Sequence, residues 1–248
     1  MTNTSISQSV ARLFQILELF EKERRPLSSQ EIVASTGAPR SSAAALLKNL
    51  VDLSILSMDR RTATYFPTAQ FGRLGSWLTE ALVSDPALLG VAHDLQQEIG
   101  ETVTISGPID HCIEVLLVER SAQVISFIAE PGQKLPLWTS AVGLTYLSTL
   151  SNTAVKALFD RMSRRGGEWA PTIPLSDILE DLEVARTQGY VVGEGRIFSD
   201  ATAFSISLPE HVGLRQLVLS VVGPNDRMRE KKTKIIAALD RAQAHFAL

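Results

Sequence analysis

The sequence predicts an α+β protein of two unequal domains: an N-terminal winged helix-turn-helix and a larger C-terminal domain in which helices flank an antiparallel sheet. Three observations predict this class. The chain has 248 residues, whereas domains of roughly 100–150 residues are commonest. Its first 70 residues show three helical patterns followed by a hairpin pattern. In the remainder, strand patterns come in runs with helical patterns grouped around them, which favours an antiparallel sheet over a doubly wound parallel one.

The N-terminal segment begins with an amphipathic helix, because apolar residues recur at helical spacing from Val10 to Phe20. The next four-residue motif, Ser28 to Glu31, has the pattern of a capping box. In that motif the serine hydroxyl accepts a hydrogen bond from the glutamate backbone, and the glutamate carboxylate accepts one from the serine backbone. A second, short helix is therefore expected to run through Ser35.

A third helix follows after a tight turn at Gly37, with Pro39 at its start, where the missing amide proton is not needed. A helix, a glycine-containing turn and a second helix form the helix-turn-helix layout. The buried face of the third helix is expected to hold Ala43, Leu46, Leu47 and Leu50.

Two strand-like pieces then surround a basic tip at Arg60 and Arg61, which predicts a wing. The predicted organisation is a DNA-binding domain at 1–70, an amphipathic linker helix at 71–84, and a second domain at 85–248 that starts at a helix-initiating Asp-Pro pair. In the second domain we expect helices near 86–99, 141–150, 153–164, 176–188 and 225–246, strands near 102–106, 111–119, 124–129, 190–196, 201–208 and 216–222, and a loop at 131–138.

Composition excludes several classes of protein. Hydrophobic residues make up 45% of the chain and charged residues 21%, which is the balance of a globular protein. No apolar stretch approaches the roughly 18–20 residues that span a bilayer, and the N-terminus lacks a signal pattern. We therefore expect a cytoplasmic protein without membrane contact.

No catalytic motif occurs, and the sequence predicts neither an enzyme nor a cofactor. Nucleophile-elbow, zinc-protease and phosphate-loop motifs are absent. The four histidines have no ligand spacing, which argues against a metal site. Cys112, the single cysteine, lies in an apolar strand pattern and reads as a buried structural thiol.

Charge and side-chain chemistry point to nucleic acid. Residues 1–75 carry a net charge of +3 and the remainder −6, which fits a DNA-binding domain on a body that phosphate does not attract. The face of the third helix opposite its core can contact the major groove, and the wing tip can contact flanking phosphate or the minor groove. The residues concerned are Arg40, Ser41, Ser42, Lys48 and Asn49 on the helix, and Arg60 and Arg61 on the wing. Because Ala43, Ala44 and Ala45 leave the helix centre bare, thymine methyls, phosphates and DNA shape are expected to carry much of the specificity.

The ordered motifs of the whole chain resemble the IclR-type bacterial transcription regulators. The resemblance rests on Ser9-Val10, Arg12, Ile16-Leu17, Pro26-Leu-Ser, Glu31-Ile32, Thr36-Gly37-Ala-Pro39-Arg-Ser41-Ser-Ala43 and Leu46-Leu47 in the first domain. In the second it rests on Glu101-Thr102-Val103, Pro131-Gly132, Leu135-Pro136-Leu137, Ala141-Val-Gly143, Gln188-Gly189-Tyr190 and Ser220-Val-Val-Gly223-Pro224.

The resemblance implies a GAF-like effector-binding domain with a pocket beside its sheet, and a homodimer that can pair into a dimer of dimers. It also implies that Arg12 and the positions of Ala44 and Ala45 belong to the DNA-binding surface. By position, the implied pocket residues are Leu137, Trp138, Thr139, Ser140, Ala141, Gly193, Ala203, Ser205, Ser220 and Val222. The acidic residue that the family usually has after the Gly-Tyr motif is replaced here by Gly193 or displaced to Glu194. The strand alternation adds Phe127 and Tyr146.

The sequence also departs from the family pattern in having Ala203 in place of a frequent Cys, Ser205 in place of a small apolar residue and Val222 in place of a frequent Ser. These departures predict an aromatic or amphipathic effector packed against Trp138 and fixed by hydroxyl groups, because a small acid needs convergent polar donors. A competing interpretation is that Trp138 only covers the core. The functional hypothesis is a repressor that binds a palindromic double-stranded operator and is controlled by a small organic effector. The alternative is a small-molecule-binding or catalytic domain whose helix-turn-helix serves protein interaction.

Overall fold

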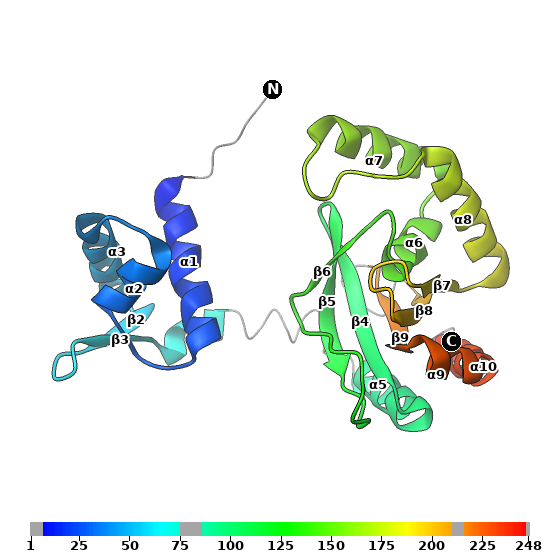
Figure 1. The fold of residues 1–248 in the computed structure, drawn as a ribbon, viewed down its shortest axis with the longest axis horizontal. Helices are drawn as coiled ribbons and strands as arrows, with labels where there is room; N and C mark the ends of the chain where they lie inside the picture. Colours follow the sequence, from blue (N-terminus) through cyan, green and yellow to red (C-terminus); the bar gives the residue numbers. More distant parts are fainter. Residues whose placement is uncertain (1–6, 75–85, 210–215, 247–248) are drawn as a thin grey trace. The chain divides into compact units, whose positions relative to one another are not determined.

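The computed structural model describes residues 7–74, 86–209 and 216–246, and the chain divides into two compact units, residues 1–78 and 79–248 (Figure 1). Of the predicted linker helix at 71–84, residues 71–74 are helical and the rest lies outside the described residues. No helix within the described ranges has the length and apolar character needed to cross a membrane.

The smaller unit is a winged helix-turn-helix. Its elements are α1 (Gln8–Glu23), β1 (Leu27–Ser28), α2 (Ser29–Thr36), α3 (Arg40–Asp52), β2 (Leu56–Asp59) and β3 (Thr64–Pro67). The strands form an antiparallel sheet in the order β1-β3-β2, in which the β2–β3 hairpin is the wing. The predicted capping box is confirmed: Glu31 N donates to Ser28 Oγ (3.3 Å) and Ser28 N donates to the Glu31 carboxylate (2.8 Å).

A small apolar core joins the three helices of this unit. Ile16 and Phe20 of α1 pack with Ile32 of α2 and Leu47 of α3, all at most 4% exposed. Val10, which the helical spacing assigns to the same apolar face, is 45% exposed because the core cluster begins only at Leu13, one turn further along α1.

The larger unit is built on an antiparallel sheet, six-stranded over the described residues, in the order β6-β5-β4-β9-β8-β7. Its strands are β4 (Thr102–Ile109), β5 (Cys112–Glu119), β6 (Lys134–Pro136), β7 (Val191–Glu194), β8 (Ala201–Ser207) and β9 (Val218–Pro224). Its helices are α5 (Pro86–Ile99), α6 (Ala141–Ser148), α7 (Asn152–Arg165), α8 (Leu175–Gln188), α9 (Asn225–Glu230) and α10 (Lys232–His245). The predicted α+β class with an antiparallel sheet is confirmed.

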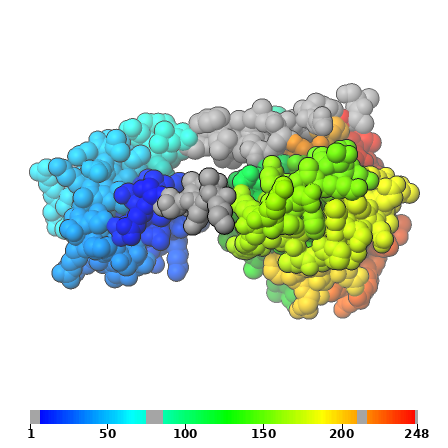
Figure 2. All heavy atoms as spheres, turned by 90° about the horizontal axis from the view of Figure 1, so that it is seen from above, coloured from blue at the N-terminus to red at the C-terminus, as the bar shows by residue number. Residues whose placement is uncertain are grey.

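Alternating side chains of the sheet face two separate cores. Val103 of β4 and Val221 of β9 face α5, α9 and α10, whereas Val218 of β9 faces α6, α7 and α8. In Figure 2 the yellow-green and yellow atoms of α7 and α8 form much of the face of the larger unit that is turned toward the viewer. The α6 side of the sheet is where the unit keeps an internal cavity, described below.

Three predicted elements differ from the structure. Residues 124–129 form no strand, because the strand next to β5 is β6, and Val115 further bonds to Gln133 and Gly132. The loop predicted at 131–138 therefore contains β6. The single helix predicted at 225–246 is interrupted at Lys231, whose ammonium group turns inward to the Ile99 carbonyl (2.9 Å).

Candidate functional site

Helix α3 presents a polar surface opposite its core. Ala43, Leu47 and Leu50 are at most 3% exposed, so the other side of the helix faces outward. The sequence pattern placed Ala43 both on the buried face and in the bare centre of the recognition surface; it is buried, which leaves two alanines in that centre. The outward-facing residues are Arg40, Ser41, Ala44, Ala45, Lys48 and Asn49, all exposed.

Ser42 and Arg12 are placed differently from the rest of the predicted DNA-binding set. Arg12 Nη1 of α1 donates a hydrogen bond of 2.8 Å to Ser42 Oγ of α3, and both residues are half-buried. The pair therefore links the first helix to the recognition helix, and the Ser42 hydroxyl is already occupied.

The wing tip carries Arg60 and Arg61 fully in solvent-exposed positions. The turn is shaped by Asp59, whose carboxylate accepts a hydrogen bond from the Arg61 backbone N–H at 2.8 Å. That bond, with a further one from the Thr62 hydroxyl, lowers the pKa of Asp59 below its ordinary value. The ionised Asp59 carboxylate is thus bonded to the backbone of the turn, while the guanidinium groups of Arg60 and Arg61 remain available to an external anion.

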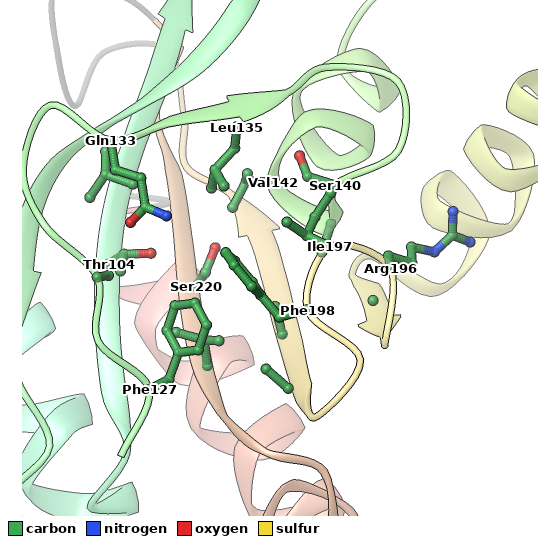
Figure 3. A pocket seen from close by; sticks show the side chains of 17 residues that line it. Thr104, Phe127, Gln133, Leu135, Ser140, Val142, Arg196, Ile197, Phe198 and Ser220 are labelled. Carbon is green, nitrogen blue, oxygen red and sulfur yellow. The ribbon is translucent and has the colours of Figure 1, made fainter. Parts of the chain in front are cut away.

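The larger unit contains a cavity of about 60 Å³ between its sheet and α6 (Figure 3). Space of that size holds roughly four to six water molecules. The walls come from each of the strands β4 to β9, from the start of α6, and from two loops, 120–133 and 195–200. The lining residues are Thr104, Val115, Phe127, Ala129, Gln133, Leu135, Ser140, Ala141, Val142, Gly193, Arg196, Ile197, Phe198, Ala201, Ala203, Ser220 and Val222.

The polar groups of the cavity are neutral. Ser220 Oγ donates to Ser205 Oγ at 2.9 Å, and Ser140 Oγ caps α6 by accepting from Gly143 N at 3.0 Å. Thr104 and Gln133 add a hydroxyl and an amide to the lining. Ser140 Oγ also donates to the Pro136 carbonyl, so both serine hydroxyl protons are used within the protein. The serine oxygens can still accept from a ligand, and Thr104 and Gln133 can orient it, without supplying a charge.

The one cation among the lining residues, Arg196, directs its charge away from the cavity. Its guanidinium pairs with the Asp181 carboxylate of α8 at 2.9 Å, and Figure 3 shows it pointing toward that helix. An anionic ligand in the cavity would therefore meet only the aliphatic part of Arg196, unless the ion pair with Asp181 were broken.

Gly193 of β7 lies close to the start of α6. A Cβ atom built on Gly193 would lie 2.9 Å from the Cβ of Ala141, at the start of α6. A larger residue therefore requires α6 to move away from the sheet. The glycine thus allows the close approach of α6 and adds no side chain to the cavity.

The structure brings seven of the twelve predicted pocket residues together. Those seven are Phe127, Ser140, Ala141, Gly193, Ala203, Ser220 and Val222. Ser205 lies directly behind Ser220, to which it is hydrogen-bonded, and is 0% exposed. Four others, Leu137, Trp138, Thr139 and Tyr146, are placed outside the cavity lining.

Trp138 is part of the packed core under α6 and α8. It is 2% exposed, and its ring meets Phe159 edge to face at 5.4 Å. Its indole N–H has no hydrogen-bond partner within the described part of the chain. Tyr146 packs against the same cluster, and burial raises the pKa of its phenol. The competing interpretation of Trp138, as a cover of the core, is the one the packing supports.

Ten of the seventeen lining residues were not predicted from the sequence. The position of Thr104 could have been predicted from strand alternation, because it lies between Val103 and Ile105 of a buried strand and must face the other side of the sheet. No sequence pattern indicates the loop residues Ile197 and Phe198, since irregular segments have no periodicity that assigns a direction to their side chains. The other missed residues are Val115, Ala129, Gln133, Leu135, Val142, Arg196 and Ala201.

A winged helix-turn-helix together with an α+β unit that encloses a cavity defines the class of one-component transcription regulators. Family models agree with this class along the chain: the IclR helix-turn-helix domain matches residues 9–60, and the C-terminal domain of the bacterial transcriptional regulator IclR matches residues 87–245. The chain belongs to the IclR family of bacterial transcriptional regulators, as the resemblance predicted. The family is one of regulators, not of enzymes.

Similar curated proteins are bacterial regulators of distant sequence. The chain is 22% identical over 246 residues to the acetate operon repressor of Salmonella typhimurium, covering 94% of this chain and 85% of that protein. It is 23% identical over 234 residues to the transcriptional repressor AllR of Escherichia coli K12, covering 91% and 83%. The Pca regulon regulatory protein of Pseudomonas putida is 21% identical over 217 residues, with 86% and 73% covered.

Solved structures share the fold. The IclR protein of Thermotoga maritima superposes with a TM-score of 0.75 at 18% identity, covering 96% of each chain. The regulator RHA06195 of Rhodococcus sp. RHA1 gives a TM-score of 0.72 at 16% identity, again with 96% of each chain covered.

Proposed function

We propose that this protein is a repressor that binds a double-stranded operator as a homodimer, with its operator affinity controlled by a small organic effector in the cavity of the larger unit. Two helix-turn-helix units related by a twofold axis fit half-sites of a palindromic operator. The sign of regulation follows the names of its similar proteins, two of which are repressors. A regulator that binds bacterial DNA acts in the cytoplasm and needs no cofactor for this role.

The observation that carries the DNA-binding proposal is the exposed polar face of α3. Arg40 and Ser41 lie at the N-terminal end of the helix, where free backbone N–H groups and the helix dipole favour phosphate. Lys48 and Asn49 follow on the same exposed side, and the wing adds two arginines. Ala44 and Ala45 present only methyl groups, which suit contact with thymine methyls.

The cavity supports an uncharged or amphipathic effector. Its hydroxyl and amide groups orient a ligand, while its remaining lining is apolar, with two phenylalanine rings. At about 60 Å³ it holds only a few non-hydrogen atoms, so an aromatic effector also needs movement of the walls. The effector controls DNA affinity only if it binds two arrangements of the dimer unequally.

Fluorescence anisotropy tests the proposal with DNA from immediately upstream of the protein's own gene. We expect sequence-selective binding that weakens as salt rises. For the double variant Arg40→Ala/Arg61→Ala, the slope of log affinity against log salt should fall by about 2, because two phosphate contacts are lost. The matched control Lys22→Ala removes an exposed cation of α1 outside the proposed interface and should leave the slope unchanged.

Selective binding that the double variant retains in full would contradict the assignment of these residues. If neither the upstream DNA nor any member of a random-sequence pool is bound selectively, the operator-binding proposal fails. Calorimetry with panels of neutral aromatic compounds and of small carboxylic acids then tests the effector, and tight binding of the acids alone would contradict an uncharged ligand.

A further inference from the structure

The inner cavity shares a wall with an open hollow on the surface of the same unit. The hollow has a volume of about 590 Å³ and is formed by residues 125–127, 197–201 and Pro224. Phe127, Ile197, Phe198 and Ala201 line both spaces. These four side chains therefore lie between the surface hollow and the inner cavity.

The two phenylalanines form the aromatic part of this wall. Their ring centroids are 5.1 Å apart with an angle of 61° between the planes, an edge-to-face contact. Figure 3 shows the two side chains reaching toward each other from the two loops, close to Ser220 on the sheet. Phe198 is 44% exposed, so its ring has solvent on one side and can change rotamer without displacing the core.

The backbone of the first loop is fixed on both sides of Phe127. Thr102 Oγ1 donates to the Phe127 carbonyl, and Arg227 Nη2 donates to the Ile125 carbonyl, each at 2.8 Å. Arg227 is itself held by two hydrogen bonds, of 2.8 and 2.7 Å, to Glu101, which is 0% exposed. This loop is therefore tied to the sheet and to α9.

The second loop, residues 195–200, is also tied to α9, at its first residue. Asn225 donates its side-chain amide to the Ser199 carbonyl at 2.9 Å and its backbone N–H to the Asp200 carbonyl at 3.1 Å. The Asn225 side chain is oriented by Thr202, whose hydroxyl donates to it at 2.7 Å. Because both loop backbones are held by these hydrogen bonds, the wall can open by rotation of the Phe127 and Phe198 side chains without displacement of either loop.

We propose that Phe127 and Phe198 form a side-chain gate between the surface hollow and the inner cavity. Rotation of one or both rings opens the passage, and the ring faces suit a neutral or aromatic molecule that must slide past them. That the passing molecule is the effector rests on the proposed function. The existence of the gate does not, because it concerns access to the cavity.

Cysteine labelling measures this access without any knowledge of the effector. Ser220→Cys places a thiol of similar size on the cavity side of the gate, in a Cys112→Ala background that removes the native thiol. Methyl methanethiosulfonate is the probe, and mass spectrometry follows the reaction. We expect slow labelling of this thiol, and acceleration by about tenfold or more when Phe198→Ala or Phe127→Ala is added, because reactivity of a buried thiol follows its access.

Two controls make the outcome specific. Ile128→Ala removes an exposed apolar side chain of the same loop that lines neither space, and should change the labelling rate by less than about twofold. Phe198→Trp enlarges the ring and should slow labelling, which answers the objection that the alanine variants merely loosen the fold. A thiol from Ser176→Cys on exposed α8 gives the rate without any barrier.

Three results would overturn the gate. They are an unchanged rate in both alanine variants, an equal acceleration by Ile128→Ala, or labelling after Ser220→Cys that is as fast as after Ser176→Cys. Operator binding is measured separately on the same proteins. A failure of the DNA-binding proposal therefore leaves the gate standing, and a failure of the gate leaves DNA binding standing.

Discussion

Helix α3 and the cavity of the larger unit place their candidate binding residues in opposite ways. On α3 the candidates face solvent because the helix buries only one stripe of side chains, and the sequence period alone assigns the others outward. In the cavity, mostly neutral side chains from several strands, one helix and two loops converge on one partly open space. The difference teaches that a binding face on one regular element can be predicted from spacing, whereas a pocket depends on contacts between distant segments.

Trp138 gives the largest expected effect in this comparison. We expect Trp138→Ala to lower the free energy of unfolding of the larger unit by about 3–5 kcal/mol, because the indole is 2% exposed and packs on Phe159. Urea denaturation followed by circular dichroism measures it. Val184→Ala, at a side chain 57% exposed on α8, is the control and should stay within about 0.5 kcal/mol. A stable Trp138→Ala variant that no longer binds effector would instead restore Trp138 to the binding site.

Glu101 is expected to have the next largest effect. Its buried carboxylate accepts hydrogen bonds from Arg227 and from Lys231 (2.7 Å). Since the two cations keep 28% and 30% side-chain exposure and can be rehydrated, Glu101→Gln should cost about 2–3 kcal/mol, less than loss of a partner in a fully buried pair. Urea denaturation at neutral pH measures the loss. An unchanged unfolding free energy would show that the cluster adds no net stability.

The pH dependence of this contribution has a definite sign. Burial raises the pKa of Glu101, but the hydrogen bonds and charges of Arg227 and Lys231 outweigh burial and leave the pKa below its ordinary value. A carboxyl group whose pKa is lower in the folded state stabilises above its unfolded pKa, and the contribution is lost as pH falls through the folded pKa. The parent should therefore lose stability in acid more steeply than Glu101→Gln.

The capping box of the helix-turn-helix unit should have a smaller effect. Ser28→Ala removes the N-cap of α2 and should cost about 1 kcal/mol, whereas Ser29→Ala, one residue into the helix, should cost less. Hydrogen bonds from the Ser28 backbone and then from Arg25 lower the pKa of Glu31 to about 2. The Glu31 contribution is accordingly present above its unfolded pKa and is lost as pH falls toward 2. Equal effects of the two serine variants would contradict the capping role.

These residues show which parts of the structure the sequence could predict. The capping box, the helical faces and the alternation of β4 are local patterns, and each led to a correct element or orientation. Residues 124–129 have the composition of a strand, yet β6 occupies the position beside β5, and no local pattern reveals that competition. The same limit applies to Phe198, because its role depends on contact with Phe127, which lies 71 residues earlier in the chain.

Arg12 gives the smallest expected effect and tests the comparison on its simpler side. The sequence resemblance groups Arg12 with the DNA contacts, but its guanidinium donates to Ser42 Oγ at 2.8 Å and is half-buried. We therefore expect Arg12→Ala to leave the salt slope of operator binding nearly unchanged, whereas Arg40→Ala should lower it by about 1. Anisotropy titrations over a range of salt concentrations measure both slopes. Equal reductions would mean that Arg12 also neutralises a phosphate, and that even the face of a single helix pair cannot be assigned from its unbound hydrogen bonds.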